Sequence, residues 1–243
     1  MGTTHQYAFG AQQNHLLAAV PSEDLNRWQS RLELVELSRN QLLYSAGCNP
    51  EYVYFPTTAI VSLLSITQEG SSAEVALVGN DGVVGISYLL GADGAATDAV
   101  VQSAGRAFRI SARFVKGEVE TSCGVMKVVM RYAQAVMGQM GQTAVCNRYH
   151  SIDQQFCRRL LSALDRLPMD ELDMTHELAA NLLGVRREGV TVAAKKLQDA
   201  GLIRYSRGHI AVLDRASLEK RACECYAPSK SEYRRLLPQA LAA

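Results

Sequence analysis

The 243-residue sequence lacks any apolar run close to the roughly 18 residues that a membrane-spanning helix needs. Residues 1–10 lack the charged segment and apolar core of a secretory signal, so we expect a cytoplasmic protein with no membrane partner. The six cysteines include no C-x-x-C pair, which weakens zinc-ribbon and thioredoxin-like interpretations. Without an export signal, we expect these thiols to stay reduced.

Motifs of enzyme chemistry are missing as well. The sequence has no Ser/His/Asp set, no Gly-rich phosphate loop and no H-E-x-x-H helix. We therefore expect that the protein is not an enzyme. An apolar fraction of 48% is ample for a packed core and excludes wholesale disorder. The length allows one large or two ordinary domains.

Neither sign of charge dominates the chain, because 25 Lys and Arg residues face 24 Asp and Glu residues. The balance conceals a local excess in residues 186–235, which carry 12 basic and 6 acidic side chains. A local basic excess matters more than the total charge when the partner is a polyanion. Charge alone still favours an ordinary solvated surface, so the choice depends on the motifs.

Short apolar runs separated by turn residues fill positions 32–111. Examples are the runs at 52–55, 59–66 and 73–78, and the turn Asn80-Asp81-Gly82 follows the last of them. Regular short strands with Gly-containing turns predict an antiparallel sandwich or jelly roll.

From about residue 112 the pattern becomes helical. Six residues advance by 3, 4, 3, 4 and 3 positions, the spacing of a heptad seam along which one helix packs on another. These six are the candidate dimerisation residues: Met126, Val129, Ala133, Val136, Met140 and Thr143. A helix that lies on its own sheet would show the same stripe, and both interpretations stay open.

A helix boundary is predicted near His150. Ser151 followed by Gln154 has the form of a capping box, in which each side chain bonds a free backbone N–H. A second helix then runs to Leu167 and stops before Pro168. The chain is therefore expected to divide at this point.

The segment 175–203 predicts two short helices that cross closely. Thr175 can cap the first helix, Ala180 is small where the helices must cross, and Gly184 suits a tight turn with positive φ. Val190 then begins the inward face of the second helix. These offsets meet the steric requirements of a helix-turn-helix, although two helices joined by a chance loop would share some of them.

The outward face of the second helix, which we place at 186–197, carries polar side chains suited to base edges in the major groove. Arginine pairs bidentately with guanine, and glutamate accepts from cytosine. An alternating segment around Gly208 then predicts a two-stranded wing whose arginines suit phosphates. The candidate DNA-binding residues are Thr175, Arg186, Arg187, Glu188, Thr191, Lys195, Arg204 and Arg207. We expect double-stranded DNA as the partner.

Together these patterns predict an α+β protein. Its parts are an amino-terminal antiparallel β jelly roll, a long dimerisation helix and a carboxy-terminal winged helix-turn-helix. We place the jelly roll with its flanking helices at 1–124, the dimerisation helix at 125–150 and the DNA-binding domain with its tail at 151–243. A symmetric homodimer would bind an inverted repeat.

The chain resembles the Crp–Fnr (cyclic-AMP receptor protein-like) transcription regulators over nearly its whole length. The family's hallmark L-G-x-[ST]-R-E-[TS]-V appears here as LGVRREGV, from Leu183 to Val190. The resemblance implies that Arg187 and Glu188 contact bases, and it allows RNA polymerase as a further partner. The family's next base-contacting Arg falls on Val192, and Gly189 replaces a usual Thr or Ser. Both departures imply an operator unlike the family's usual one.

The amino-terminal half resembles the family's cyclic-nucleotide-binding jelly roll in outline. Nucleotide-binding members carry a Gly-Glu-Leu segment and an Arg-Ser-Ala segment, which correspond here to Gly85-Ile86-Ser87 and Thr97-Asp98-Ala99. The Glu and the Arg are both missing, and Asp98 would repel a phosphate. We therefore expect a degenerate pocket, no cyclic nucleotide, no cofactor, and control by an unknown signal.

Two groups of residues are candidate metal ligands. One group would share a face of a continuous helix: Cys146, His150, Asp153 and Cys157. The cap at Ser151 interrupts that face. Cys223 and Cys225 are more typical of ordinary tail packing, and the family's amino-terminal iron–sulfur site is not expected because only Cys48 precedes residue 123. We predict no metal.

Two alternatives to this interpretation remain, which differ from it in the binding partner or in how the activity is regulated. One is a ligand-receptor module whose winged helix contacts protein instead of DNA; a salt-dependent affinity for duplex DNA distinguishes it. The other is a DNA-binding regulator without an effector, controlled by its abundance.

Overall fold

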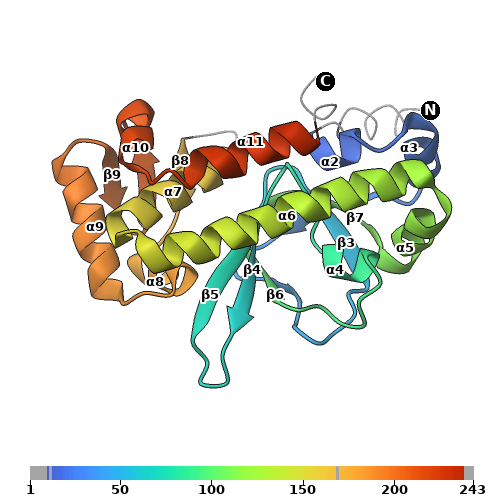
Figure 1. Ribbon diagram of the computed structural model, residues 1–243, viewed down its shortest axis with the longest axis horizontal. Helices are drawn as coiled ribbons and strands as arrows, with labels where there is room; N and C mark the ends of the chain where they lie inside the picture. Colours follow the sequence, from blue (N-terminus) through green and yellow to red (C-terminus); the bar gives the residue numbers. More distant parts are fainter. Residues whose placement is uncertain (1–9, 11–12, 168–169, 238–243) are drawn as a thin grey trace.

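The computed structural model describes residues 10, 13–167 and 170–237. A long helix, α6 (Cys123–Tyr149), runs beside a β-rich amino-terminal half and ends at a group of carboxy-terminal helices (Figure 1). The order of these parts confirms the predicted α+β class. Among the described residues, no helix is both long and apolar enough to cross a membrane.

Two antiparallel sheets form the amino-terminal half (Figure 1). One has the strand order β1-β7-β3 and the other the order β2-β6-β4-β5. The strands are β1 (Glu33–Leu37), β2 (Leu42–Tyr44), β3 (Tyr52–Pro56), β4 (Ile60–Ile66), β5 (Ser72–Val78), β6 (Asp98–Ser103) and β7 (Gly105–Ser111). Because β7 pairs with both β1 and β3 while β6 lies between β2 and β4, the chain crosses repeatedly from one sheet to the other, as in a jelly roll.

Short helices flank the sheets. They are α2 (His15–Ala18), α3 (Ser22–Trp28), α4 (Ile86–Leu89) and α5 (Ala112–Thr121). Trp28 is 1% exposed and meets the Phe114 ring edge-on at 6.2 Å, while its Nε1 donates to Glu118 at 3.0 Å. An aromatic core contact and a satisfied polar edge therefore join α3 to α5.

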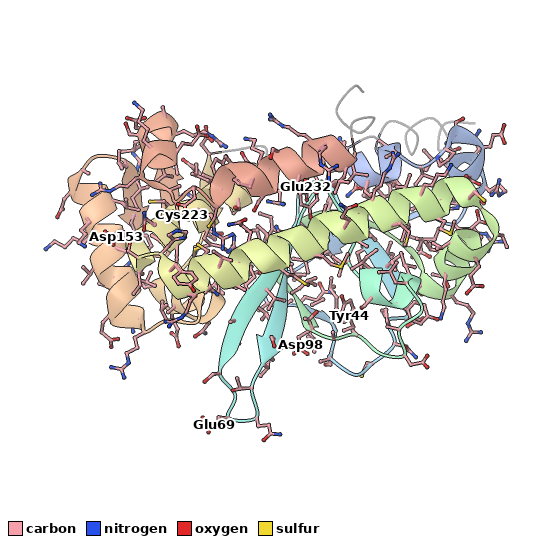
Figure 2. The ribbon with its side chains drawn as sticks, in the orientation of Figure 1. Tyr44, Glu69, Asp98, Asp153, Cys223 and Glu232 are labelled. Carbon is pink, nitrogen blue, oxygen red and sulfur yellow. The ribbon has the colours of Figure 1, made fainter. Side chains whose placement is uncertain are left out.

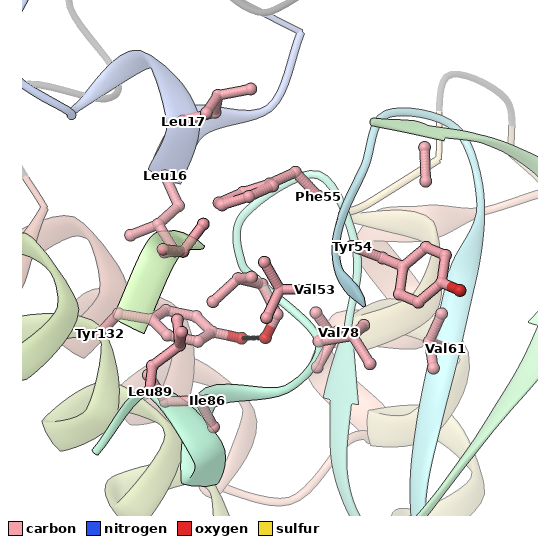
Figure 3. Packing of buried hydrophobic residues seen from close by; sticks show 14 of the residues in the cluster. Leu16, Leu17, Val53, Tyr54, Phe55, Val61, Val78, Ile86, Leu89 and Tyr132 are labelled. Atoms are coloured by element: carbon pink, nitrogen blue, oxygen red, sulfur yellow. Dashed lines mark hydrogen bonds between the residues drawn. The ribbon is translucent and has the colours of Figure 1, made fainter. Parts of the chain in front are cut away.

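The helix α6 supplies one wall of the amino-terminal core (Figure 3). Tyr132 is fully buried, and its hydroxyl donates to the Val83 carbonyl at 3.2 Å. A Cβ on Gly82 would lie 2.2 Å from the Tyr132 hydroxyl, so only glycine lets the backbone approach this closely. The long helix is thus part of the amino-terminal domain's core.

Three of the six predicted dimerisation residues lie in the core of their own chain. Val129, Ala133 and Val136 are 5%, 7% and 4% exposed. These side chains are already removed from solvent, so they gain nothing from an intersubunit seam. The other three are more accessible: Met126, Met140 and Thr143. At the centre of the stripe, α6 therefore packs on its own domain, which is one of the two interpretations that the sequence left open.

The carboxy-terminal half surrounds a second core. Its elements are α7 (Ile152–Leu164), β8 (Glu171–Asp173), α8 (His176–Leu183), α9 (Arg187–Asp199), β9 (Ile203–Ser206), β10 (His209–Val212), α10 (Arg215–Arg221) and α11 (Tyr226–Leu236). The strands form a small antiparallel sheet of order β8-β10-β9. The last helix, α11, returns along α6, where the rings of Tyr233 and Tyr132 meet at 6.2 Å (Figure 1).

The predicted capping box lies between α6 and α7. The Ser151 side chain accepts from the Gln154 N–H at 3.4 Å, and the Gln154 side chain accepts from the Ser151 N–H at 3.1 Å. His150, between the helices, has extended backbone angles. The two helices are therefore separate, as the cap predicted.

Two buried arginines, one on α7 and one just after its carboxyl end, bind the jelly roll. Arg159 reaches Glu74 on β5, and Arg166 reaches Asp81 in the loop that follows β5. A Cβ on Gly79 would lie 2.7 Å from the Arg166 Cβ, which shows how closely the two parts approach. These ion pairs set the position of α7 against the amino-terminal domain.

Candidate nucleic-acid interface

Local sequence signals build the helix pair α8–α9 as predicted. The Thr175 side chain caps α8 by accepting from the Leu178 N–H at 3.1 Å. Gly184 ends α8 with φ 65°, the left-handed conformation that glycine adopts most readily. Ala180 and Val190, at 3% and 0% exposed, fill the contact between the helices.

The amino-terminal turn of α9 presents charged side chains to solvent. The helix begins at Arg187, one residue later than predicted, and Arg186 is its extended N-cap residue. Arg186, Arg187 and Glu188 are all exposed, as is Lys195 farther along the helix. Side chains near the start of such a helix are the ones that reach base edges in a major groove.

Thr191 makes contacts inside the motif. Its hydroxyl donates to the Arg187 carbonyl at 3.0 Å, which leaves its oxygen to accept from His176 Nδ1, also at 3.0 Å. The His176 ring stacks on Tyr205 of β9 at 4.3 Å. Burial, and then the charge of Arg187, lower the pKa of His176, which favours the neutral ring. Thr191 thus helps hold α8, α9 and the wing together.

The predicted wing is the hairpin of β9 and β10. Its two-residue turn consists of Arg207 (φ 50°) and Gly208 (φ 82°), the positive angles typical of a tight hairpin turn. Arg207 is exposed at the tip, and Arg204 is exposed on β9. Both guanidinium groups are free to meet phosphates.

Two departures from the family hallmark have structural correlates in α9. A Cβ on Gly189 would lie 2.5 Å from Ile152 Cδ1, so glycine permits α9 to approach the start of α7. Val192 is 54% exposed and offers an apolar contact instead of a guanidinium group. This face of α9 therefore has fewer hydrogen-bond donors for base edges.

The segments that correspond to the nucleotide cassette have other partners. Gly85 is the N-cap residue of α4, with φ 105°, and Ile86, which corresponds to the missing Glu in the resemblance, is 8% exposed. Asp98 lies on β6, and its Oδ1 accepts from the Ala46 N–H at 2.7 Å (Figure 2). An apolar side chain and a carboxylate therefore lie at the two positions that correspond, in the sequence resemblance, to the family's Glu and Arg.

The structure brings together cysteines that sequence spacing kept apart. Cys146 and His150 lie beside Cys223 and Cys225, and the ligand atoms of all four residues are within 4.8 Å of one another. The other two members of the predicted helix face lie elsewhere: Asp153 binds Lys196, and Cys157 is buried in the carboxy-terminal core. The sequence signals of this group were the four-residue spacing of Cys146 and His150 and the C-x-C spacing of Cys223 and Cys225.

The comparisons with known proteins agree with this architecture. Residues 34–122 match the cyclic nucleotide-binding domain, and residues 154–221 match the Crp-like helix-turn-helix domain. A search of curated proteins found no match. The chain therefore belongs to the Crp/Fnr family of transcription regulators and carries the family's DNA-binding helix-turn-helix. This family is non-enzymatic.

Solved structures share the fold at low sequence identity. FixK2 from Bradyrhizobium japonicum has a TM-score of 0.69 at 14% identity, covering 79% of this chain and 98% of that chain. TTHB099, a CRP-family transcriptional regulator from Thermus thermophilus, has a TM-score of 0.64 at 18% identity, covering 77% and 96%. CLP from Xanthomonas campestris, a regulator responsive to c-di-GMP, has a TM-score of 0.62 at 15% identity, covering 79% and 99%.

Proposed function

We propose that this regulator binds a specific inverted-repeat DNA sequence as a homodimer. The observation that carries the proposal is the exposed Arg187-Glu188 pair at the start of α9, with Arg207 at the tip of the adjacent wing. In this arrangement the start of α9 reads base edges in the major groove, and the wing binds phosphates of the DNA backbone.

The candidate residues divide between these two roles. Arg187 pairs with guanine and Glu188 penalises bases that offer no donor, while Arg186 and Lys195 flank them on the same exposed surface. The remaining contacts are to phosphates, from Thr175, Arg204 and Arg207. Thr191 acts through its bonds within the motif, which hold α9 in place.

The dimer face we propose is the exposed side of α6. Met126, Met130 and Met137 are 42%, 58% and 65% exposed and follow one another by four and seven residues, so they lie on one side of the helix. Exposed methionines at this spacing form an apolar stripe that a second α6 can cover. Exposed Gly141 on the same side allows the two backbones to approach closely. Crp/Fnr regulators are typically dimeric, which supports this arrangement.

Control passes through the jelly roll, and the signal is one other than cyclic AMP. Ile86 and Asp98 supply neither of the polar partners that a cyclic nucleotide requires, and the charge of Asp98 opposes a phosphate. An effector must bind one orientation of the DNA-binding domains more tightly than another. Once bound to DNA, the regulator would act through RNA polymerase. The boundaries 1–124, 125–150 and 151–243 remain our proposed division of the chain.

Selection from random duplex oligonucleotides with the purified protein tests this proposal. We expect an enriched inverted repeat with half-site centres about 10–11 bp apart, one DNA turn, and an affinity that falls steeply with salt. Absence of any enriched duplex, with salt-insensitive binding, would favour a winged helix that contacts protein. Enrichment of a single unrepeated half-site would contradict the homodimer.

A further inference from the structure

A group of three buried cysteines and one half-buried histidine lies where the long helix ends. Cys146 is in the last turn of α6, His150 follows its end, and Cys223 and Cys225 belong to the link between α10 and α11. The three thiols are 0%, 4% and 1% exposed, and they form a cluster of their own, separate from both hydrophobic cores. Three clustered thiols beside an imidazole are unusual as simple packing and are the donor set of a structural zinc site.

The distances between the donor atoms suit one tetrahedral ion. Cys146 Sγ lies 3.5 Å from Cys223 Sγ, and Cys225 Sγ lies 3.4 Å from His150 Nδ1. Zinc–ligand bonds of about 2.3 Å to sulfur and about 2.0 Å to nitrogen give tetrahedral edges of roughly 3.5–3.8 Å. The widest separation within the set is 4.8 Å, so a contraction of about 1 Å closes the site. A multi-iron cluster, with each thiolate on a different metal atom, would need donors spread farther apart.

The surroundings of the four donors orient and neutralise them. His150 Nε2 lies 3.1 Å from Glu224 Oε1, so the carboxylate fixes the tautomer that leaves Nδ1 free to bind a metal. Arg158 is 7% exposed and lies close enough to Cys146 for its positive charge to act on that sulfur. Three thiolates and one divalent ion carry a net charge of −1, which a neighbouring guanidinium group balances.

We propose that Cys146, His150, Cys223 and Cys225 bind one Zn²⁺ ion per chain. All four positions are filled by protein, so the ion has a structural role and no open position for catalysis. The ion would tie the carboxy-terminal link to the end of α6, at the hinge where the DNA-binding domain begins. This site does not depend on the DNA-binding proposal. It replaces the sequence-based expectation that no metal is bound.

Metal analysis of the full-length protein, purified under reducing conditions and loaded with zinc, tests the proposal. We expect one zinc ion per chain after removal of free metal. Cobalt substitution should give the intense visible bands of a tetrahedral site and a sulfur-to-metal charge-transfer band. Cys146→Ser and Cys223→Ser should lose both the stoichiometric zinc and the charge-transfer band. Cys48→Ser and Cys123→Ser, which change exposed thiols outside the cluster, should retain them.

Alkylation of the wild-type protein gives a readout that does not depend on the stability of any variant. Cys146, Cys223 and Cys225 should resist a thiol reagent when zinc is bound and react after chelation, while Cys48 and Cys123 react in both states. Bound zinc well below one per chain, together with alkylation unchanged by chelation, overturns the proposal. Failure of the fully reduced protein to take up zinc, with Cys146 and Cys223 forming a disulfide instead, also overturns it.

Discussion

Arg159 of α7 donates from Nη2 to Oε2 of Glu74 on β5 at 2.8 Å, and both side chains are buried. The two residues are 85 positions apart and belong to the DNA-binding half and the jelly roll. Ser62 on β4 donates to the same carboxylate at 2.6 Å. A buried ion pair with additional hydrogen bonds is specific in geometry, so it favours one placement of α7 on the jelly roll.

Glu74→Gln leaves the Arg159 charge buried without a counterion. We expect the free energy of unfolding to fall by about 3–5 kcal/mol, the usual cost of breaking a buried pair from one side. Urea unfolding followed by circular dichroism measures this. Glu69→Gln, in the exposed turn between β4 and β5, is the matched control and should leave stability unchanged. Replacing both partners, with Arg159→Met, should recover part of the loss; equal stability of Glu74→Gln and wild type would contradict the role of the pair.

Arg187→Ala should cost on the order of 1–3 kcal/mol of DNA affinity and relax the preference at one position in each half-site, because it removes a base contact. Arg207→Ala should weaken all sequences alike and reduce the salt dependence by about one counterion, as expected of a phosphate contact. Binding selections with each variant at matched salt distinguish the two patterns. Full sequence preference in the Arg187 variant would show that α9 is not the reading helix.

Met137→Glu should separate the dimer without disturbing the fold, since this side chain is 65% exposed and carries no core contact that the charge would break. Sedimentation of the wild type should give about 53 kDa, twice the chain mass of 26.5 kDa, and the variant should approach the monomer mass. Met137→Leu keeps the apolar stripe and should remain dimeric. A dimeric Met137→Glu variant would place the interface on another surface.

Cyclic AMP and cyclic GMP should leave both the melting temperature and the DNA affinity unchanged at millimolar concentration. A ligand that binds the native state must stabilise it by mass action, so thermal denaturation is a direct test. The expectation follows from Ile86 and Asp98 at the cassette positions. A clear upward shift with either nucleotide would mean that other residues supply the missing contacts.

His209 should titrate above the ordinary histidine value of 6.5. Hydrogen bonds to Asp173 and then to Glu171 raise its pKa, because both carboxylates favour the charged ring. The bonds therefore stabilise the small sheet fully below pH 6.5, and this contribution is lost as the pH rises through the raised pKa. Ring-proton NMR shifts across the pH range measure it, with His209→Gln identifying the signal. Because the side chain is 45% exposed, added salt should reduce the shift; a pKa at or below 6.5 would refute the contacts.

The sequence alone was sufficient for features that depend on neighbouring residues. The Ser151 capping box, the Thr175 cap, the left-handed Gly184 and the two-stranded wing each need only residues a few positions apart. Their backbone preferences and short hydrogen bonds hold in almost any surroundings. The succession of jelly roll and helical parts follows from the same kind of signal, because strands and helices have different hydrophobic periods.

Tertiary structure decided which faces meet. A heptad spacing marks an apolar stripe on α6 but cannot tell whether a partner chain or the helix's own domain covers it, and the jelly roll covers Val129, Ala133 and Val136. The pair of Arg159 with Glu74 depends on the docking of α7, which no local pattern encodes. Cys146 meets Cys223 across 77 positions only because α11 returns along α6 after the helix-turn-helix is complete. Such contacts depend on the path of the whole chain, because the residues between two distant side chains carry no local pattern that marks their contact.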